Sequence, residues 1–134
     1  MDEEIHLPMH GRGEPHRPFR VLADLWRHAL EAVPETIAIE DASGALSYRA
    51  LAASAAALAT TLAEKGARGR RVAIYLPNGV DFHVAFLACL LAGATPAPIN
   101  AAYPAPQLRP LLKLAAPRLL LATPPVDPAV ATLA

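Results

Sequence analysis

The sequence predicts an α/β fold in which helices alternate with strands of a mostly parallel sheet. Segments with apolar residues at three- and four-residue steps alternate with short apolar runs, and Gly, Pro and Asn separate the two kinds. Strands that alternate with helices are typical of parallel crossovers, which place the sheet between helical layers. We therefore expect a partial layered α/β/α subdomain with a mostly parallel sheet and an N-terminal β-hairpin.

The chain of 134 residues divides into three stretches. Residues 1–18 mix prolines, glycines and charges without periodicity, and we expect them to form a flexible N-terminal arm. Residues 19–123 carry the alternating pattern and are expected to form the folded part. Residues 124–134 show no clear element and are interpreted as a tail.

The folded part is predicted to begin with a helix and a hairpin. The helix covers residues 19–32 and ends at Val33, because a proline disfavours helix in the residue before it. Strands at 36–40 and 45–47 flank an Asp-Ala-Ser-Gly segment, which is typical of a hairpin turn. The helix should pack through the face that carries Leu22, Leu25, Trp26 and Ala29.

The second helix and the strand after it are expected to have defined boundaries. Ser47 predicts the N-cap of a helix over residues 48–65, and Gly66 supplies its C-terminal cap. The strand at 71–76 is apolar without strict alternation. This pattern predicts burial on both faces of the sheet.

The third helix, Val80–Leu91, is apolar nearly all round. Asn78 and Asp81 are expected to form a pair like a capping box at its start, and Gly93 should end it. A helix without a polar face must be buried nearly all round. Where a shortened sheet leaves this helix uncovered, the apolar surface is a candidate for self-association or for binding another chain.

The last predicted elements contain prolines. A strand at 95–100 should lie at a sheet edge, because its two prolines lack the N–H that a ladder requires. A helix at 104–114 should be kinked or shortened by Pro110. A final strand is predicted at 118–122.

Composition excludes several classes of function. Twelve basic and twelve acidic side chains cancel, so the basic excess of nucleic-acid binders is absent and we expect no nucleic acid as a partner. The longest apolar stretch, residues 84–99, is shorter than the roughly 18 residues that cross a bilayer, so no membrane is expected either. The acidic N-terminus is unlike a secretory signal, and a single cysteine suits a reducing compartment. The expected location is cytoplasmic.

Two groups of residues have spacings that could suit a metal site or a phosphate site. His6 and His10 stand at a metal-ligand spacing, but Pro8 and Gly11 oppose a helix there and no further ligand follows at a fitting distance. A cluster of arginines around Gly69 favours a solvated turn over a phosphate site. Its members are Arg68, Arg70 and Arg71.

Two reactive side chains in the third helix favour structural roles. Cys89 lies within the apolar pattern, where a free cysteine packs as a small hydrophobic residue. His83 is interpreted as a helix histidine that is satisfied or partly exposed. We assign neither a role with substrate.

Several short motifs stand in a fixed order between residues 20 and 122. They are Pro34–Ala38, Leu46–Tyr48 with Leu51, Gly69 with Arg71–Ile74, Leu76 with Asn78 and Phe82, Ala92–Ala94 with Pro98, and Tyr103-Pro104. In this order the motifs resemble the N-terminal region of the adenylate-forming (AMP-binding) enzyme superfamily. That superfamily includes acyl-CoA synthetases, aryl-CoA ligases, luciferases and the adenylation domains of peptide synthetases. The sequence departs from the family pattern at Arg70 and Pro110. These departures affect the stability of the fold more than they affect the resemblance.

The resemblance implies a function, but the groups that perform its chemistry have no counterpart in this chain. Members couple ATP to a carboxylate, form an acyl-adenylate and pyrophosphate, and commonly pass the acyl group to a thiol. ATP and Mg²⁺ are implied for a full-length member, together with a phosphate loop, an acidic ribose ligand and a catalytic lysine. Ser43-Gly44 lies in a predicted turn, Gly11–Gly13 lacks flanking elements, and Lys65 and Lys113 lie beside no glycine-rich loop. We therefore expect no catalytic, cofactor-binding or metal-binding residue here.

The chain is thus interpreted as the N-terminal scaffold portion of an ATP-dependent carboxylate-activating ligase, inactive as this chain alone. Its expected partner is a chain that carries the rest of the adenylation domain, as a truncated product or a split-enzyme subunit requires. The alternative is a non-catalytic interaction module. A third possibility is a free-standing small α/β binding domain with a coincidental likeness. The acid and the acceptor, CoA or a carrier protein, are left open.

Overall fold

The computed structural model describes residues 21–131, and all structural statements below refer to that range. The hairpin, the alternation of helices and strands, and the parallel sheet are as predicted. The elements in chain order are α1 (Leu22–Ala32), β1 (Ile37–Asp41), β2 (Gly44–Ser47), α2 (Tyr48–Glu64), β3 (Arg71–Tyr75), α3 (Val80–Leu91), β4 (Thr95–Pro98), α4 (Ala105–Ala115), β5 (Leu119–Ala122) and α5 (Pro128–Ala131).

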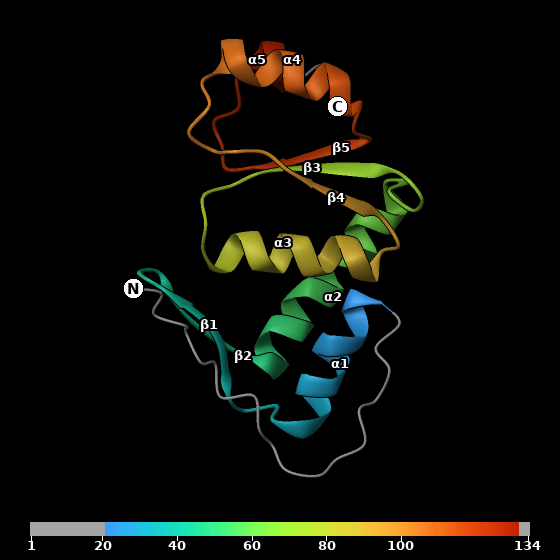
Figure 1. The fold of residues 1–134 in the computed structure, drawn as a ribbon, viewed down its shortest axis with the longest axis vertical. Coiled ribbons are helices and arrows are strands. Elements are labelled where there is room, and N and C mark those ends of the chain that lie inside the picture. Colours follow the sequence, from blue (N-terminus) through green and yellow to red (C-terminus); the bar gives the residue numbers. More distant parts are fainter. Residues whose placement is uncertain (1–20, 132–134) are drawn as a thin grey trace, which may run out of the picture.

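A three-stranded parallel sheet of order β4-β3-β5 lies between two helical layers. Figure 1 shows α3 against one face of the sheet and α4 with α5 against the other. Val72 and Ile74 belong to the core on the α3 side, whereas Ala73 belongs to the core on the α4 side. All three side chains are fully buried. The predicted burial of this strand on both faces is therefore confirmed.

The core on the α3 side is the larger of the two. Helix α2 packs against α3, and the hairpin and α1 extend the layer away from the sheet (Figure 1). Leu51 and Leu62 of α2 are buried there. The predicted burial of α3 is largely confirmed, although Leu91 near its end remains 46% exposed.

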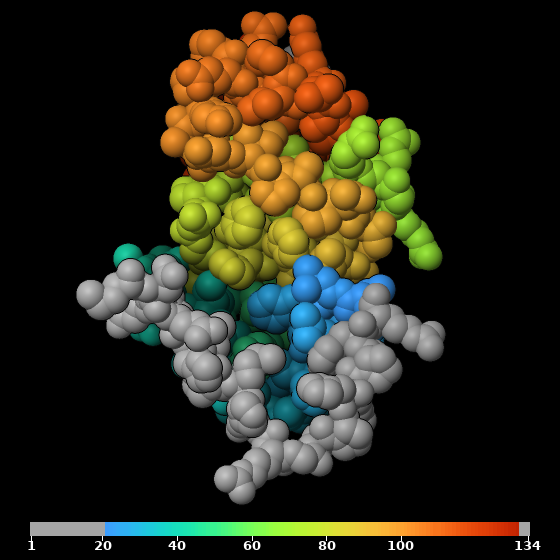
Figure 2. Space-filling view, viewed as in Figure 1, coloured from blue at the N-terminus to red at the C-terminus, as the bar shows by residue number. Residues whose placement is uncertain are grey.

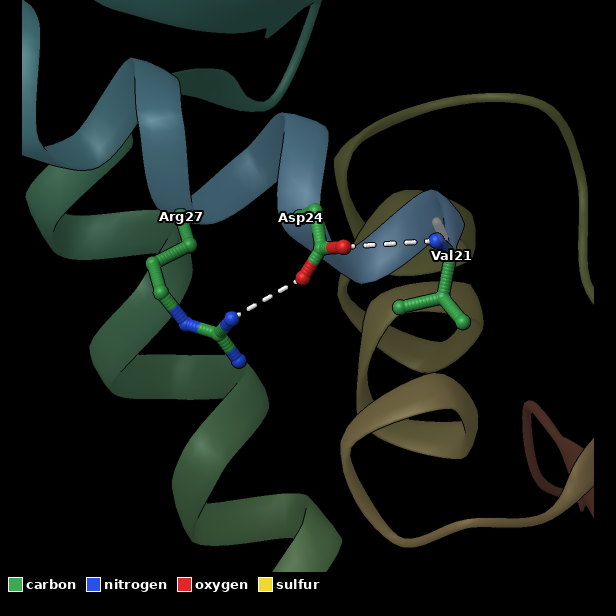
Figure 3. A network of polar contacts seen from close by, with 3 residues as sticks. All are labelled: Val21, Asp24 and Arg27. Atoms are coloured by element: carbon green, nitrogen blue, oxygen red, sulfur yellow. Dashed lines mark hydrogen bonds and ion pairs between the residues drawn. The ribbon is translucent and has the colours of Figure 1, made fainter. Parts of the chain in front are cut away.

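The face through which α1 packs differs from the predicted one. Leu22 and Leu25 are 47% and 45% exposed, while Trp26 packs against the core and lies 6.1 Å from the Tyr48 ring between centroids. The apolar stripe of α1 is therefore wider than the surface that the described residues cover. Figure 3 shows how α1 begins, with Asp24 accepting from the Val21 N–H at 3.3 Å and from Arg27 at 2.9 Å.

The predicted caps of the second helix are confirmed. The Ser47 hydroxyl accepts a hydrogen bond from the Ala50 N–H at 3.1 Å. Gly66 follows the helix with φ +77°, a left-handed conformation that glycine adopts without steric cost. Gly93 has φ +69° directly after α3 and fulfils the same predicted role.

The two helices on the other face depart from the sequence predictions. Helix α4 continues through Pro110 to Ala115, so Pro110 does not shorten it. Pro110 is exposed, and water can therefore bond the carbonyl that its missing N–H leaves free. Residues 128–131 form α5 in the stretch interpreted as a tail without elements. Val130 of α5 is 1% exposed and packs with Leu108 and Leu112.

Some predictions lie outside what the structure tests. The predicted arm, with His6 and His10, lies outside the described residues, and the boundaries at 18, 123 and 134 stay predictions. Within residues 21–131, no helix is long and apolar enough to cross a membrane.

Candidate functional site

The carboxyl ends of three parallel strands meet at one end of the sheet, which is where open α/β sheets bind ligands. The loops there are residues 76–79, 99–104 and 123–127. Between the first two loops lies a cleft of about 500 Å³. Seven of its nine lining residues are apolar and two are asparagines: Leu76, Pro77, Asn78, Phe82, Pro98, Ile99, Asn100, Ala101 and Ala102.

Most polar side chains at this end hold their own loops in place. The Asn100 carboxamide oxygen accepts from the Ala102 N–H at 2.9 Å. The Tyr75 hydroxyl donates to the Tyr103 carbonyl at 2.6 Å. Asp127 accepts from the Ala129 N–H at 2.8 Å, at the start of α5. These bonds shape the loops.

Helix α3 begins at this end of the sheet, and its first N–H is capped from far away in the sequence. The predicted cap by Asn78 is wrong, because the N-cap residue is Gly79 and no local side chain bonds the helix start. Instead, the Asp41 carboxylate accepts from the Val80 N–H at 2.8 Å. The hairpin turn is therefore tied to the loop after β3. The sequence signalled only a local turn around Asp41, because a contact across 39 positions leaves no periodic pattern.

The Asp41 carboxylate also organises its own turn. Its second oxygen accepts from the Ser43 hydroxyl at 2.5 Å and from the Ser43 and Gly44 N–H groups. The Ser43 hydroxyl, the Val80 N–H and the turn amides together lower the pKa of Asp41 to about 2. The group is therefore ionised at neutral pH, and a negative charge at a helix N-terminus is favourable.

Gly79 is the residue that lets Asp41 approach the helix start. Its φ of +153° is rare for residues with a side chain. A Cβ added there would lie 2.5 Å from an Asp41 carboxylate oxygen. The turn after β3 thus requires glycine both for its backbone conformation and for space.

Cations gather at the opposite end of the sheet. Helices α2 and α4 run towards the amino ends of the strands, so Lys65 and Lys113 at their C-termini lie away from the cleft. The Arg71 side chain donates to the Ala115 carbonyl, and Arg118 donates to the Lys65 carbonyl at 3.2 Å. The cationic residues at this amino end are Lys65, Arg68, Arg70, Arg71, Lys113 and Arg118. The arginines around Gly69 are exposed, as predicted for a surface turn.

The described residues do not fit a site for ATP and Mg²⁺. The three carboxyl-end loops contain no lysine or arginine to balance phosphate charge. Within residues 21–131, no three His, Cys, Asp or Glu side chains come close enough to hold a metal ion. A nucleotide would therefore need donors from residues outside 21–131.

His83 and Cys89 occupy structural positions in α3. The His83 ring N–H at Nδ1 donates to the Gly79 carbonyl at 2.9 Å, which also steadies the turn after β3. Cys89 is buried, and burial raises the pKa of its thiol to about 11. A thiol with such a pKa is almost entirely protonated at neutral pH and reacts poorly as a nucleophile.

A second hollow lies between α1, α2 and α3. It is an open groove of about 490 Å³. Helix α1 (blue in Figure 2) reaches the surface beneath α3 at this groove. The lining is mainly alanine and leucine around Trp26, with Arg27 and Arg49 at its border. Arg27 pairs with Asp24 and Arg49 pairs with Glu35.

Comparison with known proteins shows which proteins this chain resembles in sequence and in fold. The family model described as AMP-binding enzyme matches residues 26–133. Medium-chain fatty-acid–CoA ligase from Escherichia coli (strain K12) is 41% identical over 80 residues, covering 58% of this chain and 14% of that protein. Enterobactin synthase component F from the same strain is 35% identical over 107 residues, covering 79% of this chain and 8% of that protein. The crystal structure of apo MatB from Rhodopseudomonas palustris superimposes with a TM-score of 0.72 and 30% identity, covering 83% of this chain and 23% of that one.

A layered α/β subdomain with these matches defines a class of nucleotide-dependent enzymes. The chain belongs to the AMP-binding enzyme family, and it corresponds to the N-terminal region of the adenylate-forming superfamily. It spans less than a quarter of the length of each relative described above. The resemblance predicted from the sequence is thus confirmed at the level of family.

Proposed function

We propose that this chain is the N-terminal scaffold portion of an ATP-dependent carboxylate-activating ligase, inactive as this chain alone. The complete enzyme would form an acyl-adenylate and then a thioester. In this proposal the 134 residues supply a sheet, its helical layers and one wall of a cleft. A separate polypeptide supplies the groups that bind ATP and Mg²⁺. We further propose a cytoplasmic location, where ATP and acyl acceptors are available.

The observation that carries the proposal is the chemistry of the carboxyl end of the sheet. A cleft of about 500 Å³ lies where α/β enzymes bind ligands, yet its described walls carry no lysine or arginine. Adenylate formation brings two anions together, and this requires positive charge at the reacting atoms. The nearest lysines along the chain lie at the amino end of the sheet, so they cannot offset that charge.

Complementation tests the proposal directly. The probe is the part of E. coli medium-chain fatty-acid–CoA ligase that follows the 80 residues similar to this chain, co-produced with residues 1–134. We expect the purified pair to catalyse exchange of pyrophosphate into ATP that depends on a medium-chain fatty acid. Each polypeptide alone should catalyse none.

The matched control replaces both lysines of this chain with alanine. Because Lys65 and Lys113 lie away from the cleft, the doubly substituted chain should support the same exchange as the unsubstituted chain. Pyrophosphate exchange by the 134-residue chain alone would contradict the scaffold function. So would a doubly substituted chain that still forms the complex but no longer supports exchange.

A non-catalytic interaction module is the second candidate, and α1 is the observation that favours it. The pattern of apolar exposure differs from the sequence prediction, because α3 is largely covered and four of the five exposed leucines among residues 21–131 lie on α1 and α4. Leu22 and Leu25 of α1 are exposed, and Trp26 of the same helix lines the open groove together with Leu91. Surfaces of this kind bind other chains. Recovery of a stable complex without any exchange activity would favour this candidate.

A further inference from the structure

The cleft at the carboxyl end of the sheet has two walls, and each wall is held by a side chain that does not line the cleft. The first wall is the loop of residues 76–79, which Asp41 holds through the Val80 N–H. The second wall is formed by residues 98–102, which lead from β4 towards α4. Tyr75 donates to a carbonyl at the far end of this second wall. The two contacts therefore act on opposite walls of one cleft.

Tyr75 reaches the second wall from the other face of the sheet. Its ring packs with the core on the α4 side, whereas Leu76 and Phe82 of the cleft pack with the core on the α3 side. These two cores lie on opposite faces of the sheet (Figure 1). The ring is thus anchored away from the cleft, and the hydroxyl extends to the Tyr103 carbonyl at 2.6 Å. Tyr75 can therefore fix the wall without touching a ligand in the cleft.

Within the described residues, the loop after β4 is hydrogen-bonded to β3 at two points. The Ile99 N–H donates to the Ile74 carbonyl at 2.9 Å, where the loop begins. The Tyr75 hydroxyl bonds near the end of the loop, just before α4. Four of the nine residues that line the cleft, residues 99–102, lie between these two points. Without the Tyr75 hydroxyl, this wall would be hydrogen-bonded to β3 only where it begins.

We propose that Tyr75 is a positioning residue for the cleft and holds residues 99–102 in the conformation that a ligand requires. The part of this inference that concerns a ligand rests on the proposed function. A site whose competent conformation is only partly populated binds its ligand more weakly by that fraction. The chemical step of the bound enzyme is unaffected. Loss of the hydroxyl should therefore raise KM and leave kcat unchanged.

Amide exchange of the 134-residue chain tests the Tyr75–Tyr103 hydrogen bond without any catalysis. Tyr75→Phe removes the hydroxyl and keeps the ring in its core. The Ala102 and Tyr103 amides bond to Asn100 within the loop. We expect both amides to exchange about three- to tenfold faster in this variant, the range that the loss of one hydrogen bond implies. Amides of β3 should keep their exchange rates.

Tyr48→Phe is the matched control. This substitution also removes one hydroxyl, but the Tyr48 ring lies beside Trp26 and outside the cleft. The control should leave amide exchange in the loop after β4 unchanged. A substitution that merely destabilised the fold would speed exchange at every amide that opens by global unfolding, including those of β3. Faster exchange confined to the loop is therefore specific to a positioning role.

The complemented pair described above measures the effect on ligand binding. In pyrophosphate exchange, Tyr75→Phe should raise the KM for octanoate or for ATP about three- to tenfold, while kcat stays within about twofold. Tyr48→Phe should change neither constant. Because a destabilised chain would lose active complex, it would lower the apparent kcat and leave both KM values unchanged.

The two measurements can each contradict the inference. Unchanged exchange at Ala102 and Tyr103 in Tyr75→Phe would show that the hydroxyl does not hold this wall. Faster loop exchange with both KM values unchanged would overturn its role in ligand binding. A lower kcat with faster exchange at β3 amides would make Tyr75 a residue of the fold alone. If the unsubstituted pair shows no pyrophosphate exchange, the proposed function fails, and loop exchange still decides whether Tyr75 holds the wall.

Discussion

The two ends of the β4-β3-β5 sheet differ in charge and in the way their loops are held. The amino end gathers six cationic residues, and two of them, Arg71 and Arg118, donate to backbone carbonyls of neighbouring turns. The carboxyl end has a cleft whose described walls carry no lysine or arginine, and a turn after β3 that the distant Asp41 holds. In an α/β enzyme the carboxyl end is where ligands bind.

The difference between the two ends shows which features of a binding site the described residues provide and which they do not. Among the described residues, both lysines and four of the arginines lie at the amino end, away from the cleft. The carboxyl end is preorganised, because Asp41, Gly79 and His83 all fix the same turn. The described residues therefore form a fixed turn beside the cleft but bring no lysine or arginine to its walls.

The largest expected effect on stability comes from replacing one glycine at each end of the sheet. Gly79→Ala should destabilise the protein by about 3 kcal/mol, because its backbone lies in a region almost restricted to glycine and the new Cβ meets Asp41. Gly69→Ala at the amino end should cost only about 1 kcal/mol, since its left-handed backbone is strained but no atom lies within 4 Å of the new Cβ. Urea unfolding of the two variants measures both. Equal losses would mean that Asp41 does not hold the carboxyl end.

A smaller effect is expected from removing the Asp41 cap. Asp41→Asn should lower Tm by roughly 4–8 °C, because the Val80 N–H and the hairpin turn lose an ionised acceptor. Thermal unfolding followed by circular dichroism checks the shift. Glu40→Gln on the same strand is the control, and it should leave Tm nearly unchanged because Glu40 is exposed.

The Asp41 cap also predicts how the stability of the protein depends on pH. The pKa of Asp41 is lowered from 3.8 to about 2 in the folded protein, so the unfolded chain binds the proton more readily. The stabilisation by Asp41 is therefore complete above pH 3.8 and is lost as the pH falls towards 2. The Tm difference between the unsubstituted chain and Asp41→Asn should narrow over that interval. A difference that stays constant would argue against an ionised cap.

The smallest effect is expected at the amino end. Replacing both Lys65 and Lys113 with alanine should change the free energy of unfolding by no more than about 0.5 kcal/mol, because both side chains are exposed. Chemical denaturation checks this. A larger loss would show that the cationic end contributes to the fold more than its exposure implies.

The sequence predicted much of the fold because its signals there are local. Ser47, Gly66 and Gly93 mark helix ends through bonds or conformations within a few residues, and the apolar run of β3 reports burial on both faces. The edge position of β4 followed from its prolines. Each of these features depends on neighbours in the chain, which periodicity and turn chemistry describe.

The features that the sequence missed depend on tertiary contacts. Asn78 looked like the better cap for α3, but the hairpin brings Asp41 to the same N–H group. Pro110 lies on an exposed side of α4, so its cost is met by solvent instead of ending the helix. Helix α5 has only four residues and is held through Val130, whose partners come from α4. The sequence also did not reveal the cleft, because its walls come from two separate loops.

Pyrophosphate exchange in the complemented pair tests the scaffold account most directly. The account predicts fatty-acid-dependent exchange when residues 1–134 are combined with the downstream part of the E. coli ligase, and none from either polypeptide alone. It also predicts no specific binding of ATP to the 134-residue chain by calorimetric titration. Saturable ATP binding or exchange by this chain alone would contradict the claim that its charge lies away from the site.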